Sequence, residues 1–302
     1  MAKVVELTCE GATMRIVPGL GGRVSRLRLV SASGPRDVLV DFPEEAELAD
    51  LARWPKGGIY PLVPYGNRIR NARLRFEGTD HRLRPHPDAA PHTLHGHGHR
   101  AAWTLDEATS CTAAWSLRHR SDEEWPWAFT ARMDAWLGAS EVRLTLAVRN
   151  DDRRPMPAGL GLHPYFLCDA GDVLRFRAAR DWPATTDYLA GPPRDAAPDH
   201  AEGAQLPEDT VTLYRSAWDD AATLRRGTGA VLRLTADPVF DHLVVHRPSG
   251  AAYLCLEPAT HAPDGFNAAE AGMAEAGRRV LAPGETLSGE VAIALEGATD
   301  RA

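Results

Sequence analysis

The sequence predicts an all-β fold, a large antiparallel β-sandwich, on three observations. Short apolar runs alternate with polar residues at a period of two, which is typical of strands with one buried face. The 26 glycines and 23 prolines interrupt these runs at the spacing expected of a sandwich. Few windows hold a helical period of 3.6 residues, and no internal repeat or linker divides the chain. We therefore expect one domain over residues 1–302.

The expected strands follow one another along most of the chain. They cover residues 12–17, 23–30, 37–41, 73–76, 101–105, 111–118, 127–137, 141–149, 231–235, 242–246, 252–256 and 290–295. The apolar side chains from Val142 to Val148 alternate with polar ones and therefore share one face. Residues 44–53 and 267–277 are candidates for short helices. The stretch 183–209, rich in Pro, Ala, Asp and Gly, is predicted to be a long surface loop.

Acidic residues outnumber basic ones, 41 to 34, which gives a formal net charge of −7. A protein that binds nucleic acid or an anionic membrane needs a clustered excess of Lys and Arg, so we expect neither partner. All but two of the basic residues, Lys3 and Lys56, are arginines. We interpret this as a compositional bias rather than as an arginine-based function.

The four cysteines lie far apart and form no CxxC pair. Since Cys9, Cys111, Cys168 and Cys255 occur in a long chain, we expect them to be reduced rather than part of a disulfide framework. The first residues lack a continuous apolar segment with a cleavage pattern, and no apolar run approaches the roughly 20 residues of a membrane helix. These observations predict a cytoplasmic protein.

Four histidines, His92, His95, His97 and His99, lie within one short segment. Imidazoles on one side of an extended segment can bind zinc or copper. No Cys or carboxylate completes a recognised metal motif, however, so we expect a polar loop between strands and no metal.

A second histidine motif is AGLGLHPYF, residues 158–166, in which His163 stands among small, apolar and aromatic residues. Burial can move the pKa of an imidazole across neutrality, so that His163 can serve as an acid or a base. The alternative is a core histidine with a backbone partner.

An apolar strand ends in a carboxylate at residues 251–258, AAYLCLEP. Alternation places Tyr253, Cys255 and Glu257 on one face. A carboxylate at the end of a buried face has a raised pKa, which suits a general base. The alternative is a Glu at a strand end that reaches water.

The segment GIYPLVPYGNRIR, residues 58–70, combines aromatic side chains with Asn67 and Arg68. Aromatic faces beside an amide and a guanidinium are what a sugar-binding surface requires, because C–H faces stack and hydroxyls take directed hydrogen bonds. The alternative is an ordinary aromatic-rich turn, which can contain the same types of residue.

In this order, the segments PLVPYGNRIRNARLRFEG, HTLHGHGHRAAW, PAGLGLHPYF and LCLEPATHAPDGFN resemble the aldose 1-epimerase (galactose mutarotase-like) family. They span most of the chain. The resemblance implies a large antiparallel β-sandwich in one domain, no cofactor, and interconversion of the α and β anomers of a free aldose. It also implies that Glu257 is the general base and His163 the general acid. The residues then expected to bind the sugar are His95, near the ring oxygen, Asn67, Arg68, Tyr165 and Asp219.

The chain departs from the family pattern at two positions. Pro64 stands three residues before Asn67, where better-known members carry an Arg. The sugar-binding Asp expected before Trp218 aligns with Thr212, and Asp219 follows the Trp. Both changes bear on the choice of sugar rather than on the acid–base pair.

Two alternative functions stay open. A hexose-6-phosphate mutarotase would use the arginines around residue 70 to pair with phosphate, although alternation points Arg73 and Arg75 to solvent. A non-catalytic sugar-binding or regulatory module could share the fold, because function resides in the site. The sequence determines neither the sugar nor the oligomeric state.

Overall fold

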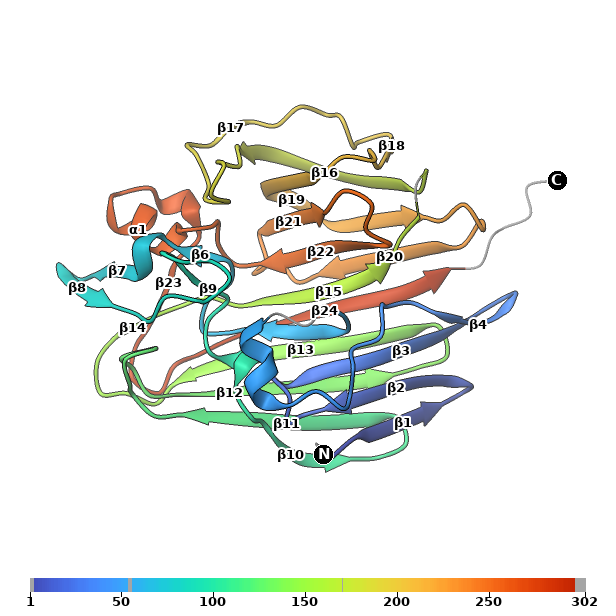
Figure 1. Ribbon diagram of the computed structural model, residues 1–302, viewed down its shortest axis with the longest axis horizontal. Coiled ribbons are helices and arrows are strands. Elements are labelled where there is room, and N and C mark those ends of the chain that lie inside the picture. Colours follow the sequence, from blue (N-terminus) through green and yellow to red (C-terminus); the bar gives the residue numbers. More distant parts are fainter. Residues whose placement is uncertain (1–2, 54–55, 170, 297–302) are drawn as a thin grey trace.

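The computed structural model describes residues 3–53, 56–169 and 171–296, which form an antiparallel β-sandwich (Figure 1). Eighteen of its strands are hydrogen-bonded into one continuous sheet that folds over on itself. The predicted fold class is therefore confirmed. None of the helices in the described ranges is long and apolar enough to cross a membrane.

The N-terminal strands and the strands of the middle of the sheet meet through β3. The first group is β1 (Val5–Cys9), β2 (Ala12–Val17), β3 (Arg23–Ser31) and β4 (Gly34–Asp37), paired in that order. From β3 the pairing continues through β5 (Ile59–Leu62), β15 (Gly161–Leu167), β22 (Tyr253–Ala259), β21 (His242–Arg247) and β19 (Val211–Arg225).

The long strand β19 passes from one group of strands to the next. Its second half pairs with β20 (Val231–Ala236), and the sheet then runs through β24 (Thr286–Glu296), β13 (Glu141–Asn150), β12 (Phe129–Leu137), β11 (Thr112–His119) and β10 (Thr104–Ala108). On its other edge β19 pairs with β16 (Val173–Trp182), which carries β17 (Arg194–Asp195) and β18 (Ala204–Gln205).

Three two-stranded sheets and a few short helices lie outside this large sheet. The sheets are β6 (Arg68–Ile69) with β9 (Thr93–Leu94), β7 (Arg73–Phe76) with β8 (Thr79–Arg82), and β14 (Met156–Ala158) with β23 (Arg279–Leu281). The helices are α1 (Gly265–Glu270) and the 3₁₀ turns Leu48–Arg53, Arg70–Ala72, Gly98–Arg100 and Ala274–Ala276. Helix α1 packs beside β7 at one end of the molecule (Figure 1).

The core forms where alternating apolar faces meet. The side chains of Val142, Leu144, Leu146 and Val148 on β13 are fully buried, as their alternation predicts. Strand β12 packs against β1 and β2, so the N-terminal strands cover this part of the sheet. Burial of these apolar faces stabilises the sandwich by about 25 cal/mol for each Å² removed from water.

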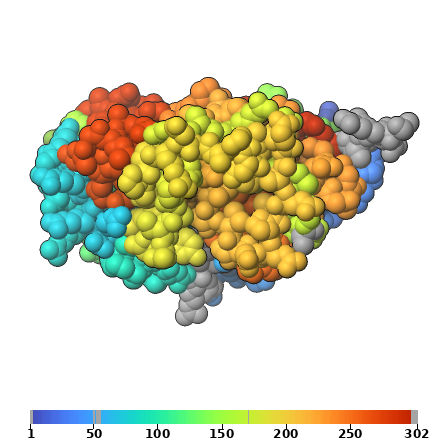
Figure 2. Space-filling view, turned by 90° about the horizontal axis from the view of Figure 1, so that it is seen from above, coloured from blue at the N-terminus to red at the C-terminus, as the bar shows by residue number. Residues whose placement is uncertain are grey.

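The structure shifts some predicted elements. The strand expected at residues 37–41 lies earlier in the chain, at Gly34–Asp37. The tight turn at Gly34 sets these residues opposite the end of β3. The helix expected at 267–277 is divided, since Gly272 has a left-handed backbone between α1 and the next 3₁₀ turn. The stretch 183–209 is a surface segment that contains two-residue strands, and its yellow atoms cover the middle of the upper face in Figure 2.

The expectation that all four cysteines are reduced is wrong for one pair. Cys9 and Cys111 form a disulfide with an S–S distance of 2.01 Å, although 102 residues separate them. The end of β1 lies beside the turn before β11, a proximity that sequence spacing does not reveal. Cys168 and Cys255 are free, as expected, and both are buried.

Candidate active site

A pocket of about 360 Å³ opens on one face of four neighbouring strands, a volume within the range of small-molecule sites. Because side chains alternate along a strand, each strand contributes every second residue to the pocket. These residues are His163 and Tyr165 from β15, Tyr253, Cys255 and Glu257 from β22, Val244 and His246 from β21, and Thr212 and Tyr214 from β19. The predicted shared face of Tyr253, Cys255 and Glu257 is thus confirmed.

Glu257 and His163 come into direct contact in this pocket. Their strands are neighbours, with Tyr165 of β15 opposite Cys255 of β22. The Nε2 atom of His163 lies 3.2 Å from Oε1 of Glu257, and both side chains are almost completely buried. The opposite faces of the two strands, with Leu162 and Leu256, pack into the core. The pair is therefore fixed by the strand register.

Burial shifts the pKa values of both groups toward their neutral forms. It raises the pKa of Glu257 from its ordinary value of 4.5 to about 8, although nearby Arg68 acts in the opposite direction. Burial also lowers the pKa of His163 well below 6.5, and the positive charge of Arg23 acts in the same direction. Near neutral pH the pair therefore holds one proton between a carboxyl group and an imidazole.

Two tyrosines hold the His163 ring in place. Tyr60 of β5 stacks on the imidazole at a centroid distance of 4.6 Å and Tyr165 at 4.8 Å, and the two tyrosine rings are themselves 6.2 Å apart. Tyr60 is the cross-strand partner of His163 in the register of β5 and β15. The orientation of the imidazole thus follows from strand pairing.

His95 comes from a loop rather than from a strand of the large sheet. The backbone N–H of Asn67 donates a 2.9 Å hydrogen bond to the ring atom Nδ1 of His95. In return, the backbone N–H of His95 donates to the backbone carbonyl of Asn67. Both residues have a left-handed backbone. Since Nδ1 accepts, the neutral ring carries its proton on Nε2. His95 is therefore a hydrogen-bond donor at the pocket that it lines.

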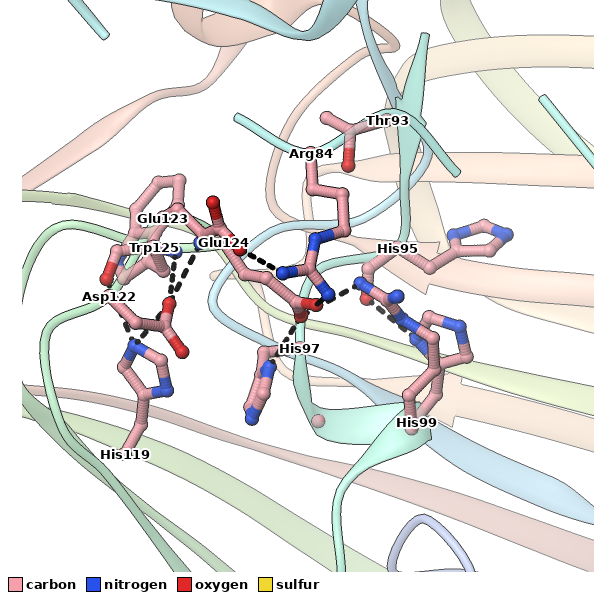
Figure 3. A network of polar contacts seen from close by, with 12 residues as sticks. Arg84, Thr93, His95, His97, His99, His119, Asp122, Glu123, Glu124 and Trp125 are labelled. Atoms are coloured by element: carbon pink, nitrogen blue, oxygen red, sulfur yellow. Dashed lines mark hydrogen bonds and ion pairs between the residues drawn. The ribbon is translucent and has the colours of Figure 1, made fainter. Parts of the chain in front are cut away.

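A carboxylate at the centre of a polar network holds the His95 loop (Figure 3). The Glu124 carboxylate is hydrogen-bonded to Nδ1 of His97 at 3.0 Å. It also forms ion pairs with Arg100 at 3.1 Å and with Arg84 at 3.0 Å. The hydrogen bond from His97 lowers the pKa of Glu124 to about 2. His99 also contacts the loop, with Nδ1 at 3.2 Å from the His95 carbonyl. These contacts fix the backbone on both sides of His95.

The other predicted sugar-binding residues divide into those that reach the pocket and one that does not. Asn67, Arg68 and Tyr165 line it, and the Arg68 guanidinium lies 4.9 Å from the centroid of the Tyr188 ring. Asp219 lies outside, where its carboxylate accepts a hydrogen bond from the backbone N–H of Arg177.

The position of Asp219 follows from the course of β19. Residues 211–216 pair with β21 beside the pocket, whereas residues 221–225 pair with β20. Asp219 falls in the transition between them, with left-handed backbone at Ala217 and Asp220. The assignment of Asp219 to the sugar site is therefore corrected. Thr212 lines the pocket instead, and its hydroxyl group is hydrogen-bonded to Nδ1 of His246 at 2.9 Å.

The four clustered histidines do not converge on one point. His92 accepts a hydrogen bond from the Asn71 N–H, His97 pairs with Glu124, and only His95 lines the pocket. A different set, His95, His163 and Glu257, has ligand atoms within 4.8 Å of one another. A neutral His95 cannot offer Nε2 to a metal while Nδ1 accepts from a backbone N–H, so this set does not fit a site of neutral imidazole ligands.

Several pocket residues were not singled out from the sequence. Lys56, Tyr188, Tyr214 and His246 line the pocket, and burial lowers the pKa of His246 to about 4. A period of two places His246 on the same face as Val244, and Tyr214 on the same face as Thr212, and this is the local signal that could have found these two residues. Lys56 and Tyr188 belong to irregular segments, for which the sequence offers no such period.

Comparisons with known proteins find a family that covers almost the whole chain. A family model described as aldose 1-epimerase matches residues 3–294. The uncharacterised protein YphB of Escherichia coli (strain K12) is 27% identical over 253 residues, which cover 78% of this chain and 83% of that protein. The chain therefore belongs to the aldose 1-epimerase family.

Solved structures share the fold over almost the whole chain. A candidate aldose 1-epimerase from Escherichia coli K12 has a TM-score of 0.85 at 23% identity and covers 98% of this chain and 99% of that one. A galactose mutarotase-like protein from Clostridium acetobutylicum has a TM-score of 0.85 at 17% identity, with 98% and 95% covered.

Proposed function

We propose that this protein is an aldose 1-epimerase that interconverts the α and β anomers of a free aldose. The observation that supports this most is the buried contact of 3.2 Å between His163 Nε2 and Glu257 Oε1. The anomeric hydroxyl and the ring oxygen of a pyranose are bonded to the same carbon, so two adjacent groups can reach both.

The reaction needs one proton removed from the anomeric hydroxyl and one delivered to the ring oxygen. In the proposed step, the one proton of the pair first passes from Glu257 to His163. Ionised Glu257 then accepts the hydroxyl proton while protonated His163 gives its proton to the ring oxygen. The C1–O5 bond breaks and the C1 carbonyl forms. After rotation about C1–C2, Glu257 returns its proton to O1 and His163 takes one from O5 as the other anomer closes. Each proton transfer contributes on the order of 10²–10⁴-fold.

The single proton of the pair suits this exchange. Ring opening moves the proton from His163 to the sugar and brings the hydroxyl proton to Glu257, which is the form that burial favours. His95, as an Nε2–H donor, would hold the ring oxygen. Arg68 and Asn67 would bind the other hydroxyl groups of the sugar.

Polarimetry of freshly dissolved aldoses tests the proposal directly. The purified protein should speed the change in optical rotation of at least one aldose without any addition, and it should keep that activity after chelation. The absence of acceleration over the whole panel would contradict the proposal. Sugar binding without acceleration would favour a non-catalytic module.

A phosphorylated substrate has less support from the structure. Arg70, Arg73 and Arg75 line a separate groove beside α1, where Arg70 and Arg73 pair with Asp264 and Asp80. Free sugars should therefore be turned over with a higher kcat/KM than their 6-phosphates. A tenfold preference for the phosphate, equal to about 1.4 kcal/mol, would favour this alternative.

We also propose that residues 1–302 form one domain and that the protein is cytoplasmic. The family match over residues 3–294 and the continuous sheet support the first proposal. The Cys9–Cys111 disulfide argues against the second, because disulfides are rare in reducing compartments. Alkylation of cysteines during cell lysis tests it: labelled Cys9 and Cys111 support the cytoplasm, and protected ones contradict it.

A further inference from the structure

Arg23 is a buried cation that the proposed reaction does not use. Its side chain is 2% exposed, and within the described part of the chain no carboxylate pairs with it. Its Nη1 atom donates a 3.2 Å hydrogen bond to the Gly57 carbonyl. Burial lowers the pKa of the guanidinium to about 10. A buried charge without an ion-pair partner is costly, so its position calls for a compensating interaction.

Two aromatic rings supply that interaction. The Arg23 guanidinium carbon lies 4.4 Å from the centroid of Phe42 and 4.3 Å from that of Tyr60. Cation–π contacts are stronger when the arginine is removed from water, as Arg23 is. The arginine is therefore held between two ring faces.

The stack continues from Tyr60 into the active site. Tyr60 stacks on the His163 ring at an interplanar angle of 24°, and His163 stacks on Tyr165 at 22°. The row Phe42, Arg23, Tyr60, His163 thus crosses β3, β5 and β15, and Tyr165 contacts both Tyr60 and His163. Strand β3 joins β5 through the pair Val24 and Ile59, so the row follows the sheet register.

We infer that Arg23 is a positioning residue for His163: through the ring of Tyr60 it fixes the imidazole plane against Glu257. The positive charge of Arg23 adds to the effect of burial, which is the larger cause of the neutral imidazole in the empty pocket. This inference rests on the proposed function only where it predicts turnover. The placement of the ring and its protonation can be measured without any sugar.

Other charged and titratable groups also face His163, and they set the background for the effect of Arg23. These groups are Lys56 before β5, Tyr60 on β5, His95 after β9, Tyr165 on β15, His246 on β21 and Glu257 on β22. The positive charges of Arg23 and Lys56 both lower the pKa of His163. For Glu257 the charge that acts is Arg68. Removing Arg23 should therefore affect the imidazole more than the carboxyl group.

The test is the pH titration of the His163 ring by ¹⁵N NMR in the wild type and in three variants, with the signal assigned by its loss in His163→Asn. In Arg23→Met the titration should move up by about one pH unit, because the imidazolium gains stability when a nearby positive charge is removed. Arg23→Lys, which keeps the charge, should retain most of the lowering. Arg28→Met is the matched control, since this exposed arginine lies on the same strand and pairs with Asp37. It should leave the titration unchanged.

Turnover separates the positioning role from a merely structural one. In Arg23→Met the acidic limb of the pH profile of kcat/KM should move to higher pH, as the NMR titration does. The alkaline limb of the profile should move less. Tyr60→Leu should lower kcat by about tenfold with little change in KM, and Tyr60→Phe, which keeps the ring, should restore it. If Arg23→Met does not fold, the two tyrosine variants still test the positioning role. In that case Arg23→Lys tests the effect of the charge.

The inference is overturned if folded Arg23→Met shows the wild-type titration of His163, or if Tyr60→Leu turns over sugar like Tyr60→Phe. If no aldose is turned over, the proposed function fails, and the NMR titration still decides whether Arg23 controls the protonation of His163.

Discussion

The two sides of the pocket are built by different physical means. Glu257 and His163 stand on neighbouring strands, where the period of two and the register bring them together. His95 stands on a loop with left-handed backbone, held by a backbone donor and by the network around Glu124. The strand side depends on the whole sheet, whereas the loop side depends on a few polar contacts.

This difference separates the expected effects of substitutions. Changes on the strand side should remove chemistry and leave the fold intact, because the replaced atoms project into the pocket. Changes in the loop network should move His95, so that binding weakens more than the chemical step does. The predictions below test this separation.

The largest effect is expected for the strand side. His163→Asn removes the titrating ring and should lower kcat by roughly 10²-fold or more, measured by polarimetry. The double variant with Glu257→Gln should lose little beyond the worse single variant, because groups that act as a unit are non-additive. If the fold losses in kcat of the two single variants multiply in the double variant, the two groups act independently.

The loop side should respond to Glu124→Gln with a rise in KM of about tenfold and a smaller change in kcat. The variant should also melt at a lower temperature, since Arg84, Arg100 and His97 all lose the carboxylate that they contact. Glu123→Gln is the matched control, because this neighbouring carboxylate is exposed and contacts only Arg84 among the residues of the network. Equal effects of the two substitutions would contradict the role of Glu124.

The pH dependence of the Glu124→Gln melting difference has a definite sign. The pKa of Glu124 is lowered from 4.5 to about 2, so its stabilisation is complete above about pH 4.5 and is lost as the pH falls through 2. The difference in melting temperature should therefore narrow as the pH falls from 5 to 3. A difference that widens with acid would be inconsistent with this carboxylate.

Glu257 should show the opposite sign. Its pKa is raised from 4.5 to about 8, so the folded state is progressively destabilised relative to the unfolded state as the pH rises between these values. Glu257→Gln should therefore be more stable than the wild type at pH 8, by about 1 kcal/mol or more in urea unfolding. At pH 4.5 the two proteins should be alike. A variant that is less stable at pH 8 would refute the burial effect.

The smallest effect is expected for the arginines outside the pocket. Arg73→Ala and Arg75→Ala should change kcat/KM for a free sugar and for its 6-phosphate by less than about twofold. Both side chains are exposed and lie in the groove beside α1. A selective loss of activity on the phosphate would place a phosphate site there.

Much of the fold could be predicted from the sequence, because alternation is a local property. Strands such as Ala12–Val17 and Arg73–Phe76 lie where the alternating residues predict them. The Cys9–Cys111 disulfide could not be predicted, since it depends on the packing of segments 102 residues apart.

The candidate site shows the same limit. Alternation placed Tyr253, Cys255 and Glu257 on one face, and the structure agrees. Asp219 was misplaced because β19 changes partner at an irregularity that the sequence does not mark. Arg23 gave no signal at all, since its role depends on the ring that β5 places beside it.

The most direct test of the central claim compares the wild type with Glu257→Gln by polarimetry on the same aldose at pH 7–8. Gln keeps the shape and hydrogen-bonding capacity of the side chain and removes the basic oxygen. The account predicts that kcat falls by roughly 10²-fold or more, while sugar binding weakens far less and the circular dichroism spectrum is unchanged. Near-normal turnover by folded Glu257→Gln would contradict it.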